Sequence, residues 1–434
     1  MFEMNKSQNP VSKKMTIFYG WIIVACVFVI LFVSFGSAYS FSTFFESLQM
    51  EFGTSRSSIS FVFSIAGFLY FSLGALSGQI ADRFGSRRVI IFGVIVVSIS
   101  LLLASRVKTI WQIYAVYGLG IGIGIGFAYV PSMGVVQRWF VKRRGLASGI
   151  AVTGIGLGTL GMPVFSAALI HWSDWRTAYL VMSILVFTCG VSAAILITDS
   201  PERRGLVPDG DEIKADTRNT SQEIFKTTAT RIREISLKDA LRTKQFWLLY
   251  TSSFSFGLGL FIPFVHLIPF SNDLGLPNAT AVMLFGLIGV GSTVGRFLLG
   301  SIADKIGRRL SLVMMYAGAA TIFAWWLVAS NVWQLAVFAL IYGACYGGYV
   351  AILPAVAADY FSGPNISGVI GMLITSVAVG NLIGPPIAGF IFDLLQSYTI
   401  PIFASVITSL FAAVCAFVLE EPDKWRESFL HSSP

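Results

Sequence analysis

Two short stretches, "GQIADRFGSRR" at Gly78–Arg88 and "GSIADKIGRR" at Gly300–Arg309, decide how this chain is organised. Their first glycines are 222 positions apart, and so are the aspartates and glycines that follow. The same offset relates other pairs: Trp111 and Gln112 to Trp333 and Gln334, Gly126 to Gly348, and Pro163 to Pro385. Several independent matches at one offset predict two six-helix halves in parallel orientation, joined by a long loop.

The chain is apolar enough to cross a membrane many times. Of its 434 residues, 55% are hydrophobic and only 12% are charged, whereas a soluble domain is about one quarter charged. Each long apolar run can cross a bilayer as a helix that satisfies its own backbone hydrogen bonds. The expected spans are 19–43, 57–80, 88–106, 111–136, 144–168, 174–197, 246–271, 279–302, 310–329, 332–357, 366–391 and 398–419. The predicted fold is all-α and polytopic, with 12 transmembrane helices in two parallel six-helix repeats.

Lysine and arginine are distributed unequally between the predicted loops. With the N-terminus placed in the cytoplasm, 25 of them lie on the cytoplasmic side and 4 on the outer side. This asymmetry predicts cytoplasmic termini in a plasma membrane or bacterial inner membrane. The polar N-terminal tail shows no small-residue cleavage site, so we expect no removed leader. The net charge of +8 follows from this topology and does not indicate nucleic acid.

The repeated pattern G-x-x-x-D-[RK]-x-G-[RK]-[RK] resembles the signature of the major facilitator superfamily. Narrower features resemble its monocarboxylate transporter branch and bacterial relatives, including oxalate/formate exchangers. They are "YGWIIV" in span 1, "FFESLQMEFGTSRSSIS" after it, "RWFVKRRGLASGIA" across loop 4–5, "VHLIPFSNDLG" in span 7 and "GNLIGPPIAGFIFD" in span 11. We expect an N-terminal six-helix bundle (1–197), a cytoplasmic linker loop (198–245) and a C-terminal bundle with a tail (246–434). Substrate would bind between the bundles and cross by rocking of one against the other.

The linker is polar and carries ten basic residues. Its second part, "SLKDALRTKQFW", fits a short amphipathic helix on the inner membrane surface, and a flexible tether is an equal alternative. The two copies of the repeated motif are compact charge clusters at helix ends, where the dipole favours such charges. The resemblance implies that they act as a gate, and positive-inside anchoring is the simpler alternative. The gate residues are Gly78, Asp82, Arg83, Gly85, Arg87, Arg88, Asp304, Lys305, Gly307, Arg308 and Arg309.

Arg296 lies inside span 8, where a charge costs roughly 2.5–3.5 kcal/mol on insertion scales. It is eight residues before Asp304, or ~12 Å along a helix, so a long side chain reaching the surface is one explanation. Pairing with an acid is another, but no Asp or Glu lies deep in any span. We favour a guanidinium that faces a cavity and binds an anion, because its planar fork suits a carboxylate. The resemblance also implies that an Arg in this place binds the substrate carboxylate.

Other candidates for the substrate site are polar side chains in the spans. Tyr39, Tyr129 and Tyr346 lie in helices that line the cavity in the resembled superfamily, although each could equally be a core tyrosine. Asn381 could contact substrate or bond a neighbouring helix. His266 is the only histidine within a span, and its ordinary pKa near 6.5 makes it a candidate proton carrier. A structural hydrogen-bond role for His266 is the competing interpretation.

The sequence departs from the resembled families in places that matter for coupling. The dicarboxylate exchangers carry a Lys in span 11, and this chain has none there, with Val377 or a neighbour in that region. One fixed cation favours one carboxylate. Animal monocarboxylate transporters have a Lys late in span 1 and an Asp four residues before the span 8 Arg, where this chain has Tyr39 and Ser292. Both are linked there to proton coupling, so the coupling ion stays open.

The sequence therefore predicts a secondary transporter of small organic anions, most simply monocarboxylates such as lactate or pyruvate, with protons as one option for coupling. A carboxylate exchanger, a carrier of drugs or other solutes, and an anion-binding membrane sensor remain alternatives. Three histidines and four dispersed cysteines form no catalytic or metal-binding pattern, so we expect no enzyme, metal or cofactor. The expected partners are the substrate and the lipid bilayer, without nucleic acid or an obligatory protein partner.

Overall fold

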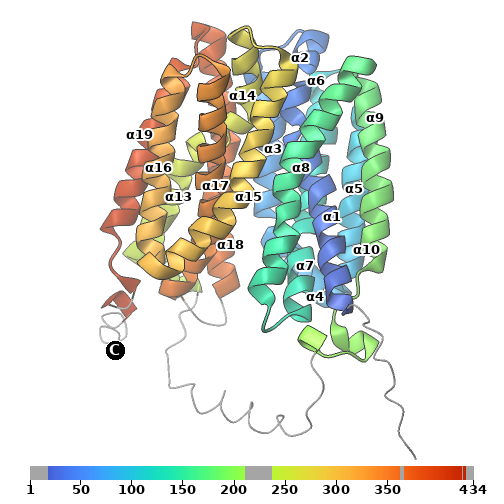
Figure 1. Ribbon diagram of the computed structural model, residues 1–434, viewed down its shortest axis with the longest axis vertical. Helices are drawn as coiled ribbons and strands as arrows, with labels where there is room; N and C mark the ends of the chain where they lie inside the picture. Colours follow the sequence, from blue (N-terminus) through green and yellow to red (C-terminus); the bar gives the residue numbers. More distant parts are fainter. Residues whose placement is uncertain (1–17, 211–236, 362–365, 423, 427–434) are drawn as a thin grey trace, which may run out of the picture.

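The computed structural model describes residues 18–210, 237–361, 366–422 and 424–426. The side chains of Ala75, Asp304 and Ser367 lie outside the described part. The helices run roughly along one long axis and form two groups side by side, one from each half of the sequence (Figure 1). Helix α1 begins and α19 ends at the same end of the molecule, where the two halves are connected. We call this end the linker end and the other the Arg56 end.

The first group contains the spans of the N-terminal half. Its elements are α1 (Tyr19–Tyr39), α2 (Phe41–Phe52), α3 (Arg56–Ser72), α4 (Gly74–Phe84), α5 (Ser86–Ala104), α6 (Ile110–Ile113), the π-helix η1 (Tyr114–Leu119), α7 (Gly120–Trp139), α8 (Arg144–Trp172), α9 (Trp175–Leu185), the π-helix η2 (Val186–Val191) and α10 (Ser192–Leu196). Two short 3₁₀ turns follow, η3 (Pro201–Arg204) and η4 (Pro208–Gly210).

The second group contains the spans of the C-terminal half. Its elements are α12 (Leu237–Ala240), α13 (Lys244–Leu260), α14 (Ile262–Asp273), α15 (Asn278–Ile306), α16 (Arg308–Val328), α17 (Val332–Phe361), α18 (Ile366–Leu395) and α19 (Thr399–Val418). The expected amphipathic helix of the linker is a single turn, α12, because the residues from Lys244 onward already belong to α13.

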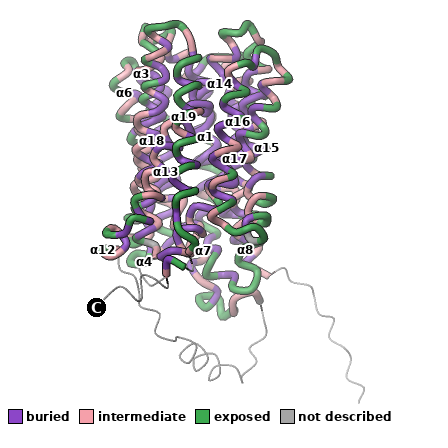
Figure 2. The backbone as a smooth tube through the Cα atoms, turned by 90° about the vertical axis from the view of Figure 1, so that its left-hand side faces the viewer, coloured by how far each residue is buried: buried purple, intermediate pink, exposed green. Residues whose placement is uncertain are grey.

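The predicted spans are confirmed within the described residues. Eleven helical stretches are long and apolar enough to cross a membrane, and a twelfth is the pair α3–α4, bent by 52°. Buried residues lie where helices face one another, and exposed residues lie on the outside of the bundle (Figure 2). That surface is apolar: Phe403, Phe411 and Phe417 of α19 are each more than half exposed. Such a surface suits lipid and not water.

The internal repeat is visible in local geometry. Gly85 and Gly307, which are 222 residues apart, precede α5 and α16 with nearly identical dihedrals, φ 90°, ψ 135° and φ 92°, ψ 136°. Only glycine adopts this region without strain. The side chain of Gln112 accepts the N–H of Lys108, and Gln334 accepts the N–H of Ser330 in the same way. The two halves are therefore copies of one fold, as the sequence predicted.

Spans 1 and 7 break at equivalent places. Span 1 changes from α1 to α2 at Ser40, and span 7 changes from α13 to α14 at Phe261, 221 residues later. At Ser40 the side chain donates a 2.7 Å hydrogen bond to the Gly36 carbonyl. Two seams join the halves, α3 against α18 and α8 against α15. The broken helices bring polar side chains into the space between these seams.

Candidate functional site

Arg296 projects from α15 toward the other half of the molecule. It lies ten residues, or ~15 Å, before the linker end of that helix. Its Nη1 donates to the backbone carbonyl of Val152 in α8 at 3.3 Å, and its Nε is buried without a partner. Among the residues that the structure describes, no carboxylate forms an ion pair with it. A cation with unused donors inside an apolar bundle is suited to binding an anion.

Tyrosine hydroxyls from both halves lie near this guanidinium. Tyr39, at the break in span 1, and Tyr346 of α17 place their hydroxyl oxygens 3.1 Å apart. Arg296 interacts electrostatically with the hydroxyls of Tyr346 and of Tyr129 from α7. Tyr70 of α3 interacts electrostatically with Tyr39, and its own buried hydroxyl has no hydrogen-bond partner. The structure thus places Tyr129 and Tyr346 beside Arg296, with Tyr39 bonded to Tyr346, and it adds Tyr70, which the sequence did not indicate.

Aromatic rings close the sides of this group. The Phe35 ring lies 5.4–5.8 Å from the rings of Tyr39, Tyr70 and Tyr129. The Phe264 ring of α14 lies 4.8 Å from Tyr39 and 5.1 Å from Tyr346. This environment is apolar except for the hydroxyls and the one guanidinium. It can hold a small anion by one charge-assisted contact and several neutral hydrogen bonds.

The neighbouring tyrosines of α17 do not join this group. Tyr342 donates its hydroxyl proton to the carbonyl of Leu260 within the C-terminal half. Tyr349 packs on Phe256 and Tyr316, also within that half. Of the three tyrosines spaced along one face of span 10, only Tyr346 faces the other half. Helical spacing alone could not make this distinction.

Asn381 lies on the seam between α18 and α3. Its Nδ2 donates to the carbonyl of Ser64 at 3.3 Å, while its Oδ1 is buried without a partner. Gly67 of α3 lies directly against this amide, because a Cβ atom there would stand 1.8 Å from Nδ2. Its described contacts are with α3, so it acts here as a contact between the halves.

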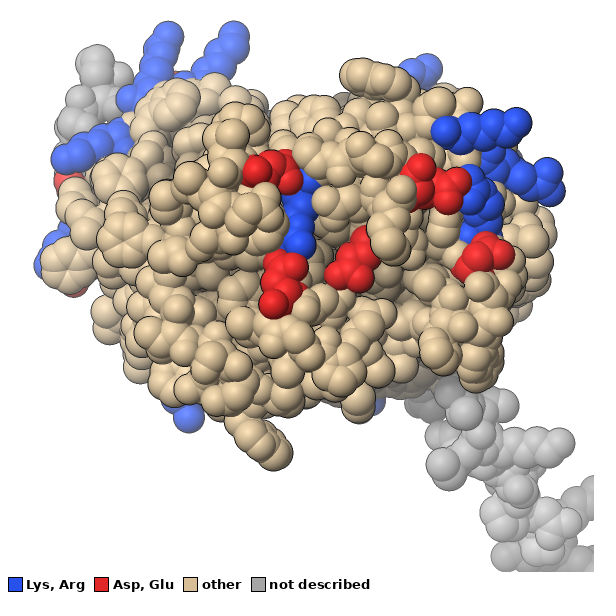
Figure 3. Space-filling view, turned by 90° about the horizontal axis from the view of Figure 1, so that it is seen from above, with Lys and Arg blue, Asp and Glu red and all other residues tan. Residues whose placement is uncertain are grey.

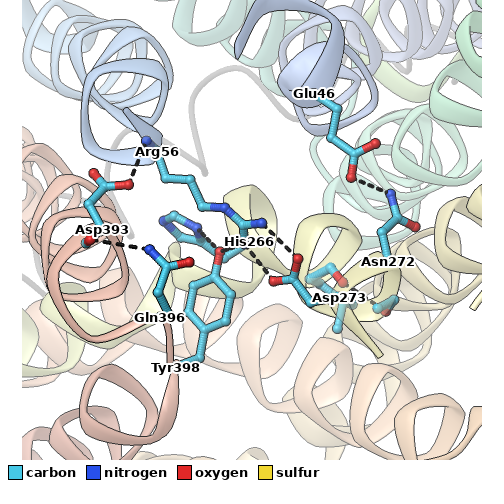
Figure 4. A network of polar contacts seen from close by, with 10 residues as sticks. Glu46, Arg56, His266, Asn272, Asp273, Asp393, Gln396 and Tyr398 are labelled. Carbon is cyan, nitrogen blue, oxygen red and sulfur yellow. Dashed lines mark hydrogen bonds and ion pairs between the residues drawn. The ribbon is translucent and has the colours of Figure 1, made fainter. Parts of the chain in front are cut away.

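The structure places His266 in a polar network at the Arg56 end, with other partners than Arg296 (Figure 4). The ring is fully buried. Its Nε2 lies 2.9 Å from the carbonyl oxygen of Pro385 and 3.1 Å from the Ser60 hydroxyl. Its Nδ1 lies 3.0 Å from the Tyr398 hydroxyl. His266 therefore links four spans near one end of the bundle.

Arg56 is the centre of the same network. Its guanidinium forms two 2.7 Å contacts with the Asp273 carboxylate and donates a third hydrogen bond to Tyr398. The guanidinium also lies 3.9 Å from the centroid of the Phe392 ring, a cation–π geometry. Because Arg56 belongs to the N-terminal half and these partners to the other, the contacts close this end of the molecule.

Asp393 of α18 completes this closure by capping α3. Its two carboxylate oxygens accept the N–H groups of Arg56 and Ser57 at 3.0 Å. Nearby, Asn272 donates to Glu46 at 2.7 Å, also across the halves. Figure 3 shows acidic side chains gathered around basic ones on this face. We call Arg56, His266, Asp273, Asp393 and Tyr398 the latch. In the sequence, Arg56, Asp273 and Asp393 lie just outside the predicted spans, which gives no sign that they meet.

The repeated charge motifs at the linker end make different contacts. Asp82 is mostly exposed and lies 4.0 Å from Arg138, and Arg308 pairs with Asp359 at 2.8 Å. Arg309 donates to the Phe417 carbonyl. Each of these three contacts lies within one half. The other motif residues are Gly78, Arg83, Gly85, Arg87, Arg88, Lys305 and Gly307, at the ends of α4, α5, α15 and α16, and the Asp304 side chain lies outside the described part.

A cavity of about 540 Å³ lies beside the second motif and is separate from the Arg296 group. Its lining includes Arg308, Arg309, Asp359, Phe417 and Arg426. No group of His, Cys, Asp or Glu with the arrangement of a metal site was found among the described residues.

Residues 198–210 of the linker are packed against the N-terminal half and are not a free tether. Trp139 donates to the Thr198 carbonyl at 2.8 Å, and Asp199 pairs with Arg203. Asp209 accepts three consecutive N–H groups, from residues 141 to 143, just before α8. Burial raises the pKa of the Asp209 carboxyl, but these N–H donors outweigh it and hold that pKa below its ordinary value.

Comparison with known proteins identifies the family. The family model of the Major Facilitator Superfamily matches residues 27–329 and 290–433. The chain therefore belongs to this superfamily, a class of multi-pass membrane proteins that transport small solutes. Its fold agrees: a D-xylose-proton symporter superposes with a TM-score of 0.70 and 15% sequence identity, over 94% of this chain and 98% of the symporter.

Within the superfamily, the resemblance to monocarboxylate transporters is confirmed by similar sequences. Monocarboxylate transporter 12-B of Danio rerio is 28% identical over 89% of this chain and 84% of its own length. Monocarboxylate transporter 2 of Homo sapiens is 24% identical over 88% of this chain and 83% of its own. These relatives are transporters and not enzymes.

Proposed function

We propose that this protein is a secondary transporter of small organic anions, with monocarboxylates as substrates, working by alternating access. The observation that supports this proposal is the environment of Arg296. Its guanidinium has no carboxylate partner among the described residues and interacts with Tyr129 of one half and Tyr346 of the other. A substrate carboxylate would take the place of the Val152 carbonyl as its acceptor and would neutralise the charge. A single cation suits one carboxylate better than two.

The proposed moving units are the bundles 1–197 and 246–434, joined by the linker 198–245. The linker end faces the cytoplasm in this proposal, as the distribution of basic residues predicts. The latch then closes the outer end, and the repeated motifs gate the inner end. The Tyr39–Tyr346 hydrogen bond would open when the bundles rock apart at the site. Relatives named monocarboxylate transporters support this choice of substrate.

Uptake of labelled lactate and pyruvate into proteoliposomes tests the proposal. We expect saturable uptake that is lost in Arg296→Gln, because removal of a charge-assisted hydrogen bond costs about 1.5–3 kcal/mol, roughly a tenfold to hundredfold loss in kcat/KM. Arg296→Lys keeps the charge without the fork and should retain part of the activity. Arg106→Gln, an exposed arginine in a loop at the Arg56 end, is the matched control and should transport normally.

Two outcomes would contradict the proposal. Normal uptake by Arg296→Gln would return Arg296 to a structural role. No saturable uptake of either acid by the wild type, but uptake of an uncharged solute, would favour a carrier of another substrate class.

A further inference from the structure

We propose that His266 is a proton-binding site that controls the latch, so that protonation from outside opens the outer end of the transporter. The inference rests on the alternating access proposed above but not on the identity of the substrate. It assigns to His266 a site separate from Arg296, with a proton as its ligand.

Hydrogen-bond directions define the protonation of the ring in the closed latch. The Pro385 carbonyl oxygen can only accept, so Nε2 carries a proton and donates it. The Tyr398 hydroxyl oxygen already accepts from Arg56 Nη1 at 2.7 Å, so its own proton is directed to Nδ1. Nδ1 is therefore an acceptor, and the imidazole is neutral when the latch is closed.

A second proton on His266 conflicts with this arrangement in two ways. Nδ1 would become a donor facing the same phenol oxygen that Arg56 already uses, and the Tyr398 proton would lose its acceptor. The ring would also become a cation beside the guanidinium, in a buried site where like charges repel strongly. The closed latch therefore disfavours a charged His266.

The surrounding acids do not relieve this conflict. Both oxygens of Asp273 bind the Arg56 guanidinium, and both oxygens of Asp393 bind N–H groups at the start of α3. Glu46 of α2 is engaged by Asn272. The remaining neighbour from α2 is the Phe45 ring, 5.8 Å away and edge-on. Asp273 and Asp393, the two carboxylates of the latch, therefore cannot turn an oxygen to a new N–H from the ring without weakening a contact that closes the latch.

The coupling follows from thermodynamic linkage. A proton that binds the open form and not the closed form shifts the equilibrium toward the open form. An imidazole exposed to water takes up a proton near pH 6.5, so the ratio of open to closed forms should rise roughly tenfold between about pH 7.5 and about pH 5.5. Acid outside would then expose the Arg296 site to the outer side.

Distance measurements between spin labels test this in lipid nanodiscs without substrate. Labels would be placed at Lys108→Cys and Leu395→Cys, exposed positions of the two halves at the Arg56 end, in a chain lacking the four native cysteines. We expect the population with a long distance to grow about tenfold relative to the short one on acidification. His266→Gln, which can still donate to Pro385 but does not titrate, should remain closed at both pH values.

The controls separate His266 from the carboxylates. Asp393→Asn weakens the latch itself and should be more open at both pH values, but its roughly tenfold acid response should remain, because His266 is intact. An acid response of wild-type size in His266→Gln would overturn the proposal, and so would a wild type that does not open. If His266→Gln fails to fold, Tyr398→Phe decides: it should be more open at neutral pH, and an unchanged distance would overturn the proposal. Because no substrate is present, failure of lactate or pyruvate transport leaves this readout unaffected.

Discussion

The seam between α3 and α18 offers a prediction whose sign depends on a single contact. Gly67→Ala adds a Cβ atom that would stand 1.8 Å from Nδ2 and 2.8 Å from Cγ of Asn381. Asn381 is fully buried, so its side chain cannot move aside into solvent. Overpacking of this kind typically costs about 1–3 kcal/mol, and we expect Gly67→Ala to destabilise the protein by that amount.

The effect should disappear, or reverse, when the amide is removed. In an Asn381→Ala background the new methyl group meets no side-chain amide, and alanine is favoured over glycine in a helix by about 1 kcal/mol. The second substitution also removes the buried Oδ1 that has no partner. The two substitutions should therefore be strongly non-additive, with a coupling energy of about 2–4 kcal/mol.

The free energy of unfolding in mixed micelles, measured for both single variants and the double variant, provides the assay. Gly145→Ala is the matched control, because no atom lies within 4 Å of the added Cβ, and it should be neutral or slightly stabilising. Equal destabilisation by Gly67→Ala with and without Asn381 would refute the reasoning. It would mean that the backbone and not this amide limits the approach of the two helices.

Three further predictions concern the two ends of the bundle. Asp273→Asn removes the charge that Arg56 binds through two 2.7 Å contacts, and it should shift the halves toward the open outer end roughly tenfold; unchanged spin-label distances would contradict this. Asp209→Ala should destabilise the protein by about 1 kcal/mol at neutral pH, as loss of a helix cap does. Because the pKa of Asp209 is lowered in the folded protein, its contribution to stability is present above the ordinary aspartate pKa near 3.9 and is lost as the pH falls through the folded pKa. An unfolding titration in which Asp209→Ala differs equally from wild type at acidic and neutral pH would contradict this. Gly307→Ala should cost about 1–3 kcal/mol in thermal unfolding, because φ is 92° there. Gly85→Ala should cost at least as much, because φ is 90° and the added Cβ would also stand 3.1 Å from Asp199 Oδ2; a loss at only one of the two positions would contradict this.

The linker is a segment whose composition alone did not predict its structure. Its polarity and basic residues left a tether and an amphipathic helix equally open. In the structure, Asp209 holds residues 198–210 against the first half by accepting three N–H groups. These N–H groups lie just before α8, a helix that begins about 65 residues earlier in the chain. An aspartate in a polar loop gives no local sign of such a distant partner.

The sequence by itself determined the class of this protein, because lipid requires long apolar helices and a duplicated motif records two equivalent halves. It also selected Arg296 as the candidate anion-binding residue, since a charge within an apolar span needs a reason, and this role stays a prediction. Only the tertiary structure decided which polar side chains meet. Tyr346 and not Tyr349 faces Tyr39, and His266 joins Arg56 and Tyr398 instead of Arg296. These contacts connect residues 132 to 342 positions apart, and they depend on how helices rotate and break, which local periodicity does not specify.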